Sequence, residues 1–394
     1  MVSKQAPHGG WKASTAGGIH LKTCSQESGE VHGKFRLTSP SDCYAQIVFN
    51  SIRISNAPSA PFPRTFVESE LEYKELGKTG IRISAIGIGT WQWGSREWGW
   101  SRTYGKRDLL EALHKALELG INLVDTAEIY GKGKSEELIG EAIQGHREEV
   151  VIATKVSPMN LTYGRALRAA DRSIRRLRVD VIDLYQIHWP NPFIPIRNTM
   201  KALKQLVEAG KVRCIGVSNF NLEKMKAAQD ALPPSELASN QVKYNLLDRR
   251  VEKDLLPYTN HERITVIAYS PLAQGLLTGK YSPESLPQTA VQSMNARFSP
   301  ANLSRLGKLT NTLLEIARAH GKTSSQVALN WLIRKENVVA IPGVKRPEHV
   351  LDNVGATDLR LTQQEIEKLE TIASKIRFSR LSGLPNLLRA FTRV

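Results

Sequence analysis

The sequence has few of the residues that build disulfide-stapled, metal-binding or membrane-spanning proteins. Its only cysteines are Cys24, Cys43 and Cys214, which are too few for a disulfide framework and show no metal-ligand spacing. No apolar run approaches the ~18–20 residues of a transmembrane helix, and no apolar segment follows the first lysine as in a secretory signal. We therefore expect a cytoplasmic protein that has no metal site and does not span or bind a membrane.

Acidic residues are scarce relative to basic ones: the chain has 38 Asp and Glu but 54 Lys and Arg, which gives a net charge of +16. Such an excess can indicate a nucleic acid, an anionic surface or a polyanionic small ligand. The basic residues are scattered along helical patterns, as at Arg165, Arg168 and Arg172, and are not interleaved with aromatic residues that could stack on bases. We expect no nucleic-acid partner.

The first part of the chain carries no helical period. Residues 1–68 are rich in Ser, Gly and Pro and are predicted to be a disordered or weakly ordered, flexible extension. Glu27 and Glu30 disfavour a transit peptide there, so organellar targeting is the weaker alternative to a cytoplasmic location. The domain is expected at 69–376, followed by a tail at 377–394.

The remainder alternates short apolar runs with amphipathic helical patterns. Eight such units indicate parallel βαβ connections, which form an open sheet or close into a barrel, and eight is the number of a single-domain (β/α)8 TIM barrel. A longer segment at 276–323 precedes the last unit and is either a cover over the site or a surface insertion. The predicted strands are 85–89, 121–126, 150–155, 181–189, 212–218, 238–242, 265–270 and 337–342.

Four titratable residues stand at the ends of neighbouring predicted strands. Asp125 ends the second strand and Tyr130 lies in the loop after it, while Lys155 ends the third and His188 the fourth. In a barrel these ends meet at one mouth. There the Lys155 ammonium, paired with Asp125, would stabilise the Tyr130 phenolate, and His188 could orient a carbonyl or relay a proton. We expect Tyr130 to be a proton donor.

Several motifs around these residues resemble the aldo-keto reductase superfamily over residues 71–376, nearest to the branch that includes channel β-subunit-like reductases. The resemblance implies the catalytic tetrad Asp125, Tyr130, Lys155 and His188, and NAD(P)H-dependent reduction of aldehyde or ketone carbonyls to alcohols. The motifs are DTAEIYG (125–131), VIATK (151–155), IDLYQIHWP (182–190), GVSNF (216–220), NQVKYN (240–245), AYSPLAQGLLTGKY (268–281) and IPGVK (341–345).

The same resemblance implies a cofactor that lies extended across the barrel, which agrees with the lack of a GxGxxG loop: Gln92 stands at the place of its last glycine. Where the family commonly has Arg or Gln this chain has His349, so Lys345 and Arg346 would hold the 2′-phosphate, and NADPH is favoured over NADH. The implied cofactor residues are Ser218, Asn219 and Gln241 at the nicotinamide amide, Tyr269 on its ring, Ser270, Pro271, Leu272, Gly275, Leu277 and Lys280 at the pyrophosphate, and Gly343, Lys345, His349, Asp352 and Asn353 at the adenosine end.

Tryptophans mark a candidate substrate pocket. Trp91, Trp93, Trp98 and Trp100 cluster after the first predicted strand and Trp189 follows His188. Such residues could line an apolar site for a small carbonyl substrate, or some could pack the rim; Trp91, Trp93 and Trp189 are the candidates for substrate contact. The identity of the substrate, and whether the protein is a monomer or a homo-oligomer, stay open. Two other functions also stay open: a redox-sensing regulatory subunit that binds NADPH with little turnover, and a lyase or isomerase on the same fold.

Overall fold

The computed structural model describes residues 12–16, 19–23 and 71–379, which fall in two units, Met1–Phe66 and Val67–Val394. In the first unit, β1 (Lys12–Ala16) pairs antiparallel with β2 (Ile19–Thr23). The rest of the predicted extension at 1–68, and most of the predicted tail at 377–394, lie outside the described residues.

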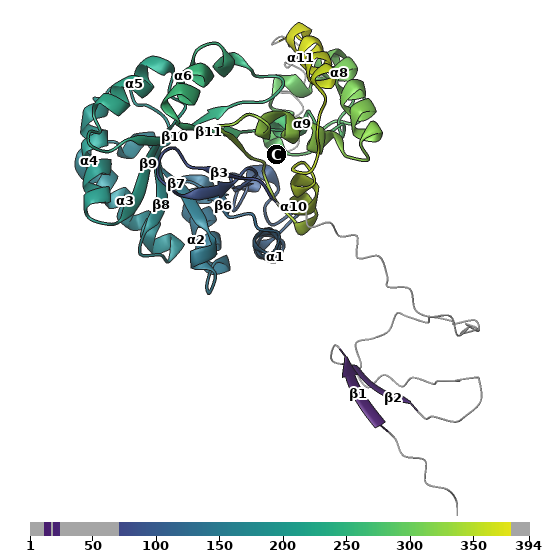
Figure 1. Ribbon diagram of the computed structural model, residues 1–394, viewed down its shortest axis with the longest axis horizontal. Helices are drawn as coiled ribbons and strands as arrows, with labels where there is room; N and C mark the ends of the chain where they lie inside the picture. The colour runs from purple at the N-terminus through teal and green to yellow at the C-terminus, as the bar shows by residue number, and fades with distance from the viewer. Residues whose placement is uncertain (1–11, 17–18, 24–70, 380–394) are drawn as a thin grey trace, which may run out of the picture. The chain divides into compact units, whose positions relative to one another are not determined.

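The second unit contains an eight-stranded parallel barrel (Figure 1). Each strand pairs with its neighbour in chain order, and the first and last strands meet where the Gly87 amide donates to the Ala340 carbonyl (2.8 Å) and the Gly89 amide to Pro342 (2.9 Å). The predicted TIM barrel is thus confirmed. Its strands are β5 (Ile88–Gly89), β6 (Leu123–Asp125), β7 (Val151–Val156), β8 (Ile182–Ile187), β9 (Val212–Ser218), β10 (Leu237–Lys243), β11 (Thr265–Tyr269) and β12 (Val338–Ile341).

The barrel strands do not alternate strictly between polar and apolar residues, because both faces of each strand are covered. Every residue of β7 and β8 is buried, one face against the surrounding helices and the other inside the barrel. The base of the barrel is closed by the hairpin of β3 (Tyr73–Glu75) and β4 (Arg82–Ser84), which was not predicted from the sequence. Leu76 and Ile83 from this hairpin join the interior cluster of strand side chains.

Amphipathic helices surround the barrel (Figure 1). In α1, for example, Leu109, Leu113 and Ala116 form the buried face at helical spacing. No described helix is long and apolar enough to cross a membrane. The helices are α1 (Lys106–Glu118), α2 (Lys134–Ala142), α3 (Tyr163–Leu177), α4 (Ile196–Glu208), α5 (Leu222–Asp230), α6 (Leu255–Glu262), α7 (Ala290–Ser293), α8 (Pro300–Ala319), α9 (Ser324–Ile333), α10 (Pro347–Val354) and α11 (Gln363–Lys375).

Short 3-10 helices occupy several connections, and two of them bear on the site. The first, η2 (Tyr130–Gly133), follows β6, and the second, η6 (Ala273–Gly275), follows β11. The region 248–262, whose pattern is unclear from sequence, holds η5 (Arg250–Glu252) and α6. Between β11 and α9 the chain inserts α7 and α8, and α8 packs beside α11 (Figure 1). The others are η1 (Arg96–Trp98), η3 (Arg147–Glu149), η4 (Pro158–Asn160) and η7 (Ala296–Phe298).

Candidate active site

A buried ion pair lies at the centre of the barrel mouth. The Lys155 Nζ is 2.8 and 2.7 Å from the two carboxylate oxygens of Asp125 and donates a third hydrogen bond to the Thr126 carbonyl at 2.7 Å. Asp125 is 2% exposed and Lys155 is not exposed at all. Burial raises the pKa of Asp125 and lowers that of Lys155, whereas each group's charge stabilises the other's charged form. Gln241 adds a hydrogen bond from Nε2 to Asp125 Oδ1 at 2.6 Å.

Tyr130 reaches this pair from the tight η2 turn. Gly131 has a φ of 54°, and a Cβ there would lie 2.8 Å from the Trp93 carbonyl oxygen, so the turn packs against the β5 connection only with glycine. The Tyr130 ring meets the His188 ring edge-on at 5.5 Å, and the Lys155 Nζ is 5.0 Å from the Tyr130 ring centroid. The structure thus brings the four predicted tetrad residues together.

The pKa of Tyr130 is raised well above its ordinary value, first by burial, then by the negative charge of Asp125, and least by the neighbouring phenol of Tyr269. This direction is opposite to the one expected from an adjacent ammonium. Burial is the largest cause, and all three N–H groups of Lys155 point to Asp125 and Thr126 rather than to the phenol. Tyr130 therefore remains a protonated phenol at neutral pH.

His188 follows β8 and faces the same space. Burial, with a smaller contribution from the Lys155 charge, lowers the pKa of His188 to about 3. Its Nδ1 is buried and has no hydrogen-bond partner among the described residues. The imidazole is consequently neutral at pH 7, which suits it to hydrogen-bond a carbonyl oxygen rather than to act as a cationic acid.

A cavity of about 1150 Å³ opens above these side chains at the carboxyl ends of the strands. Asp125, Tyr130 and His188 form part of its lining, with Lys155 buried beneath. Leu277 does not line the cavity, because it is buried in the core behind the η6 turn. Fourteen predicted cofactor residues line it: Ser218, Asn219, Gln241, Tyr269, Ser270, Pro271, Leu272, Gly275, Lys280, Gly343, Lys345, His349, Asp352 and Asn353.

The three tryptophans predicted to contact the substrate take different positions in the structure. Trp91 and Trp189 line the cavity and are 44% and 47% exposed. Trp93 is fully buried, because its indole Nε1 donates to the Val344 carbonyl at 2.9 Å and its ring packs in the core. Trp93 therefore supports the wall of the cavity from behind and cannot touch a molecule inside it.

The wall beside the tetrad is fixed through Asn219, whose φ of 62° is unusual for a residue other than glycine. Its Nδ2 donates to the His188 carbonyl at 3.1 Å and to the Ser218 hydroxyl at 2.9 Å, and its Oδ1 accepts from the Tyr269 hydroxyl at 2.9 Å. The Asn219 side chain thus links the carboxyl ends of β8, β9 and β11 around the space above Tyr130.

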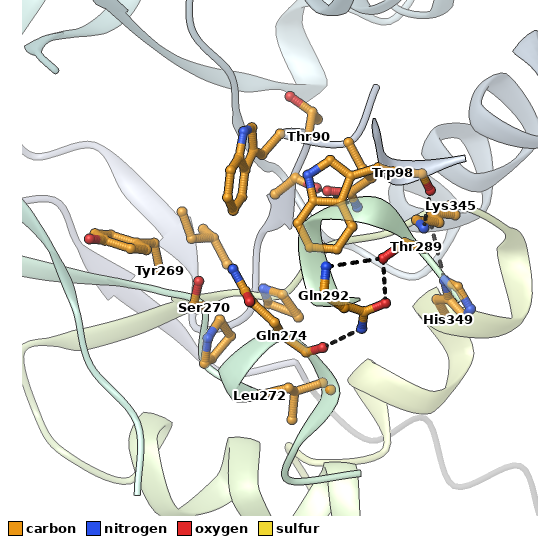
Figure 2. A pocket seen from close by; sticks show the side chains of 18 of the residues that line it. Thr90, Trp98, Tyr269, Ser270, Leu272, Gln274, Thr289, Gln292, Lys345 and His349 are labelled. Carbon is orange, nitrogen blue, oxygen red and sulfur yellow. Dashed lines mark hydrogen bonds between the residues drawn. The ribbon is translucent and has the colours of Figure 1, made fainter. Parts of the chain in front are cut away.

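The insertion after β11 covers another part of the cavity, as Figure 2 shows. The Gln292 Nε2 donates to the Gln274 carbonyl at 2.7 Å, and Gln292 Oε1 accepts from the Thr289 hydroxyl at 2.6 Å. These three residues line the cavity and were not predicted individually. They fall in or beside the segment 276–323, whose length was the only sequence signal. The position of this segment agrees with the interpretation that it covers the site, rather than with a surface insertion.

Lys345 lines the cavity with its ammonium between two aromatic rings. Its Nζ is 5.4 Å from the Trp98 ring centroid and 4.8 Å from that of Tyr104, and it donates to the Trp98 carbonyl at 2.8 Å. Burial, followed by repulsion from Lys280 and Arg346, lowers the pKa of Lys345 to about 8. Trp98, one of the tryptophans clustered after the first predicted strand, also lines the cavity, as does Tyr104, which was not predicted to do so.

Comparisons with known proteins agree with this geometry. The profile of the Aldo/keto reductase family matches residues 85–374. An uncharacterized oxidoreductase from Mycobacterium tuberculosis is 42% identical over 306 residues, covering 77% of this chain and 94% of that protein. The chloroplastic pyridoxal reductase of Arabidopsis thaliana is 38% identical over 314 residues, 75% and 84% of the two chains.

Solved structures give the same result. An aldo-keto reductase from Klebsiella pneumoniae in complex with NADPH superposes with a TM-score of 0.64 at 32% identity, covering 77% of this chain and 96% of that one. The family match covers well over half of the sequence, and it falls on the barrel that carries Asp125, Tyr130, Lys155 and His188. This chain belongs to the aldo/keto reductase family.

Proposed function

We propose that the protein reduces aldehyde or ketone carbonyls to alcohols with NADPH, with Tyr130 as the proton donor. One observation carries the proposal: a protonated phenol, a neutral imidazole and a buried ion pair converge on the floor of a single cavity. A group that must give up a proton and a group that can hold a carbonyl oxygen therefore face the same small volume.

The cavity suits an extended dinucleotide. At the η6 turn, Ser270, Ala273 and Gln274 all have positive φ, which makes a concave main chain of the kind that holds anionic oxygens. Lys280 and Lys345 supply positive charge in the same lining. The Klebsiella pneumoniae relative holds NADPH in its crystal structure, which supports the same cofactor here.

Two ends of that cofactor have candidate partners. Ser218, Asn219 and Gln241 line the cavity next to the tetrad and would bind the nicotinamide amide, with Tyr269 beside the ring. Lys345 would bind the 2′-phosphate at the other end, and the buried Trp98 Nε1, which has no partner among the described residues, lies in the same part of the lining. When bound, the reduced nicotinamide supplies the hydride.

The protein's own groups supply the rest of the chemistry. The neutral His188 imidazole donates a hydrogen bond to the substrate carbonyl oxygen and sets its position. As negative charge develops on that oxygen, the Tyr130 hydroxyl transfers its proton to it. The Lys155 ammonium, held by Asp125 and Thr126, stabilises the resulting phenolate through space and does not donate to it directly.

The test is Tyr130→Phe, which keeps the ring and removes only the exchangeable proton. NADPH oxidation with an activated aldehyde should slow by at least ~10²-fold, while the affinity for NADPH, measured by fluorescence titration, should be unchanged. Tyr258→Phe, on α6 and outside the cavity lining, is the matched control and should behave like the native protein.

A Tyr130→Phe protein with near-native turnover would remove Tyr130 from this role. Tight NADPH binding by the native protein with no turnover on any aldehyde would instead favour the redox-sensing alternative. Turnover without any nicotinamide cofactor would favour the lyase or isomerase alternative.

A further inference from the structure

A second buried carboxylate, Glu136, lies behind the tetrad. It belongs to the first turn of α2, and its side chain has no exposed area. Its Oε1 accepts a hydrogen bond from the Thr154 hydroxyl at 2.6 Å, and its Oε2 accepts one from Arg176 Nε at 2.7 Å. Thr154 lies on β7 directly before Lys155, and Arg176 lies on α3. Glu136 therefore joins α2 and α3 to the strand that carries the tetrad lysine.

The residue before it, Ser135, ties the same helical turn to the buried ion pair. Its hydroxyl oxygen, also fully buried, is 2.8 Å from Thr90 Oγ1 and 2.9 Å from Thr126 Oγ1. The Thr90 hydroxyl donates to the Asp125 carbonyl at 2.8 Å, and the Thr126 carbonyl accepts from the Lys155 ammonium. The start of α2 is thus connected by hydrogen bonds to the strand ends on which both members of the ion pair stand.

The turn that carries Tyr130 runs directly into this helix, because η2 ends at Gly133, next to the first residue of α2. Gly131 and Lys132 have φ angles of 54° and 57°, so the turn has no regular helical geometry of its own. Gly133 has a φ of 93°, and a Cβ there would lie 2.9 Å from Arg176 Cδ. The aliphatic part of Arg176 therefore covers the end of the turn while its guanidinium binds Glu136.

A buried ion pair contributes little net stability, because the cost of removing both charges from water offsets their attraction. Its hydrogen bonds nevertheless hold one arrangement, and a displacement of about 1 Å at a reacting group can slow a reaction about a hundredfold. We propose that Glu136 and Arg176 are positioning residues: they hold the start of α2 and the end of η2 against β7 and so fix the Tyr130 phenol beside Lys155. This inference rests on the proposed function and adds to it the residues that set the geometry of the proton donor.

Glu136→Met tests the proposal, because it removes both hydrogen bonds at similar side-chain volume. The Arg176 side chain is 22% exposed and can turn its charge to water, so no unpaired charge stays buried. The kcat for an activated aldehyde should fall by at least tenfold, while KM and the dissociation constant for NADPH should stay within twofold of the native values. An unchanged kcat would overturn the inference.

Glu136→Gln distinguishes position from charge. A glutamine amide can accept from Arg176 and donate to the Thr154 hydroxyl, so it keeps the connections and loses only the negative charge. Its kcat should recover to within threefold of the native value. A Glu136→Gln protein as slow as Glu136→Met would mean that the charge of Glu136 acts on Lys155, and would contradict a positioning role.

Glu252→Met is the matched control for the loss of a carboxylate. Glu252 likewise accepts from a hydroxyl and a guanidinium, those of Tyr244 and Arg249, each at 2.7 Å, and none of these three residues lines the cavity. Its kcat should equal that of the native protein. A loss in Glu252→Met as large as that in Glu136→Met would indicate a general effect on the fold and would overturn the inference.

Fluorine NMR of the full chain labelled with 3-fluorotyrosine tests the geometry without any turnover. The Tyr130 resonance is identified by its absence from Tyr130→Phe, and it depends on the His188 ring, 5.5 Å away and edge-on. It should shift or broaden in Glu136→Met and stay unchanged in Glu252→Met. A shift in a protein that reduces no aldehyde would support the positioning role while the proposed function fails, whereas an unchanged resonance in Glu136→Met would overturn the positioning role whatever the turnover.

Discussion

His188 should make the protein sensitive to acid, by an amount that follows from its burial. The folded protein lowers the pKa of this imidazole from 6.5 to about 3. A depressed folded pKa means that the folded state resists protonation, so stability is complete above pH 6.5 and is lost as the pH falls from 6.5 towards 3. At 1.36 kcal/mol per pH unit, the full loss is about 4–5 kcal/mol, of which about 3 kcal/mol falls between pH 7 and pH 4.

Urea unfolding at pH 7 and pH 4 measures this loss, with His188→Gln as the variant that cannot titrate. The native protein should lose about 3 kcal/mol more than His188→Gln between the two pH values. Using the difference between two pH values cancels any constant effect of the substitution on the fold. His261→Gln, whose side chain is 83% exposed, is the control and should lose as much as the native protein.

Equal acid sensitivity of the native protein and His188→Gln would refute the reasoning. It would mean that His188 is protonated at about its ordinary pKa in the folded protein, with water or a rearranged Nδ1 contact stabilising the cation. The imidazole would then be a competing proton donor near pH 6, and the assignment of that role to Tyr130 would lose its electrostatic basis.

Two further predictions concern Lys345 and the first part of the chain. NADPH should bind more tightly than NADH at pH 7. The NADPH affinity should fall by about tenfold between pH 7 and pH 9, because Lys345, with a pKa of about 8, loses its charge. Fluorescence titration of the native protein and Lys345→Ala measures this, and a pH dependence that persists in Lys345→Ala would contradict the prediction. Removing residues 1–68 should leave the thermal unfolding midpoint and the NADPH affinity unchanged, and a truncated protein that lost either would show that the segment belongs to the barrel.

The sequence predicted the parts of the site that follow from chain order. Strands in a barrel end at one face, so Asp125, Lys155 and His188 could be placed together once the strands had been found. The strands themselves were visible because burial on both faces makes them continuous apolar runs, as in β7 and β8. The β3–β4 hairpin was missed because strands of three residues have no period to detect.

Other parts depend on contacts that sequence spacing does not encode. Lys345 is held by Trp98 and Tyr104, residues more than 240 positions earlier, and no pattern in the sequence around Lys345 or around these aromatic residues predicts the contact. The direction of the Tyr130 pKa depends on how deeply the phenol is buried and on where the Lys155 protons point, which are properties of the packed barrel. The sequence therefore singled out Tyr130 as a candidate proton donor but predicted the direction of its pKa shift wrongly.

The closure of the barrel has a consequence for its synthesis. Lys74 is 8% exposed, and its ammonium bonds to the carbonyl oxygens of Ile333, Lys335 and Val338, 259 to 264 residues further along the chain. The first strand of the barrel likewise has no second partner until β12 exists. Contacts this distant in sequence form late, after the loop between them has been closed. A growing chain on the ribosome therefore carries two unpaired strand edges, one on β5 and one on the strand made last, until nearly all of the barrel has been translated. In that interval it is most exposed to pairing with another chain.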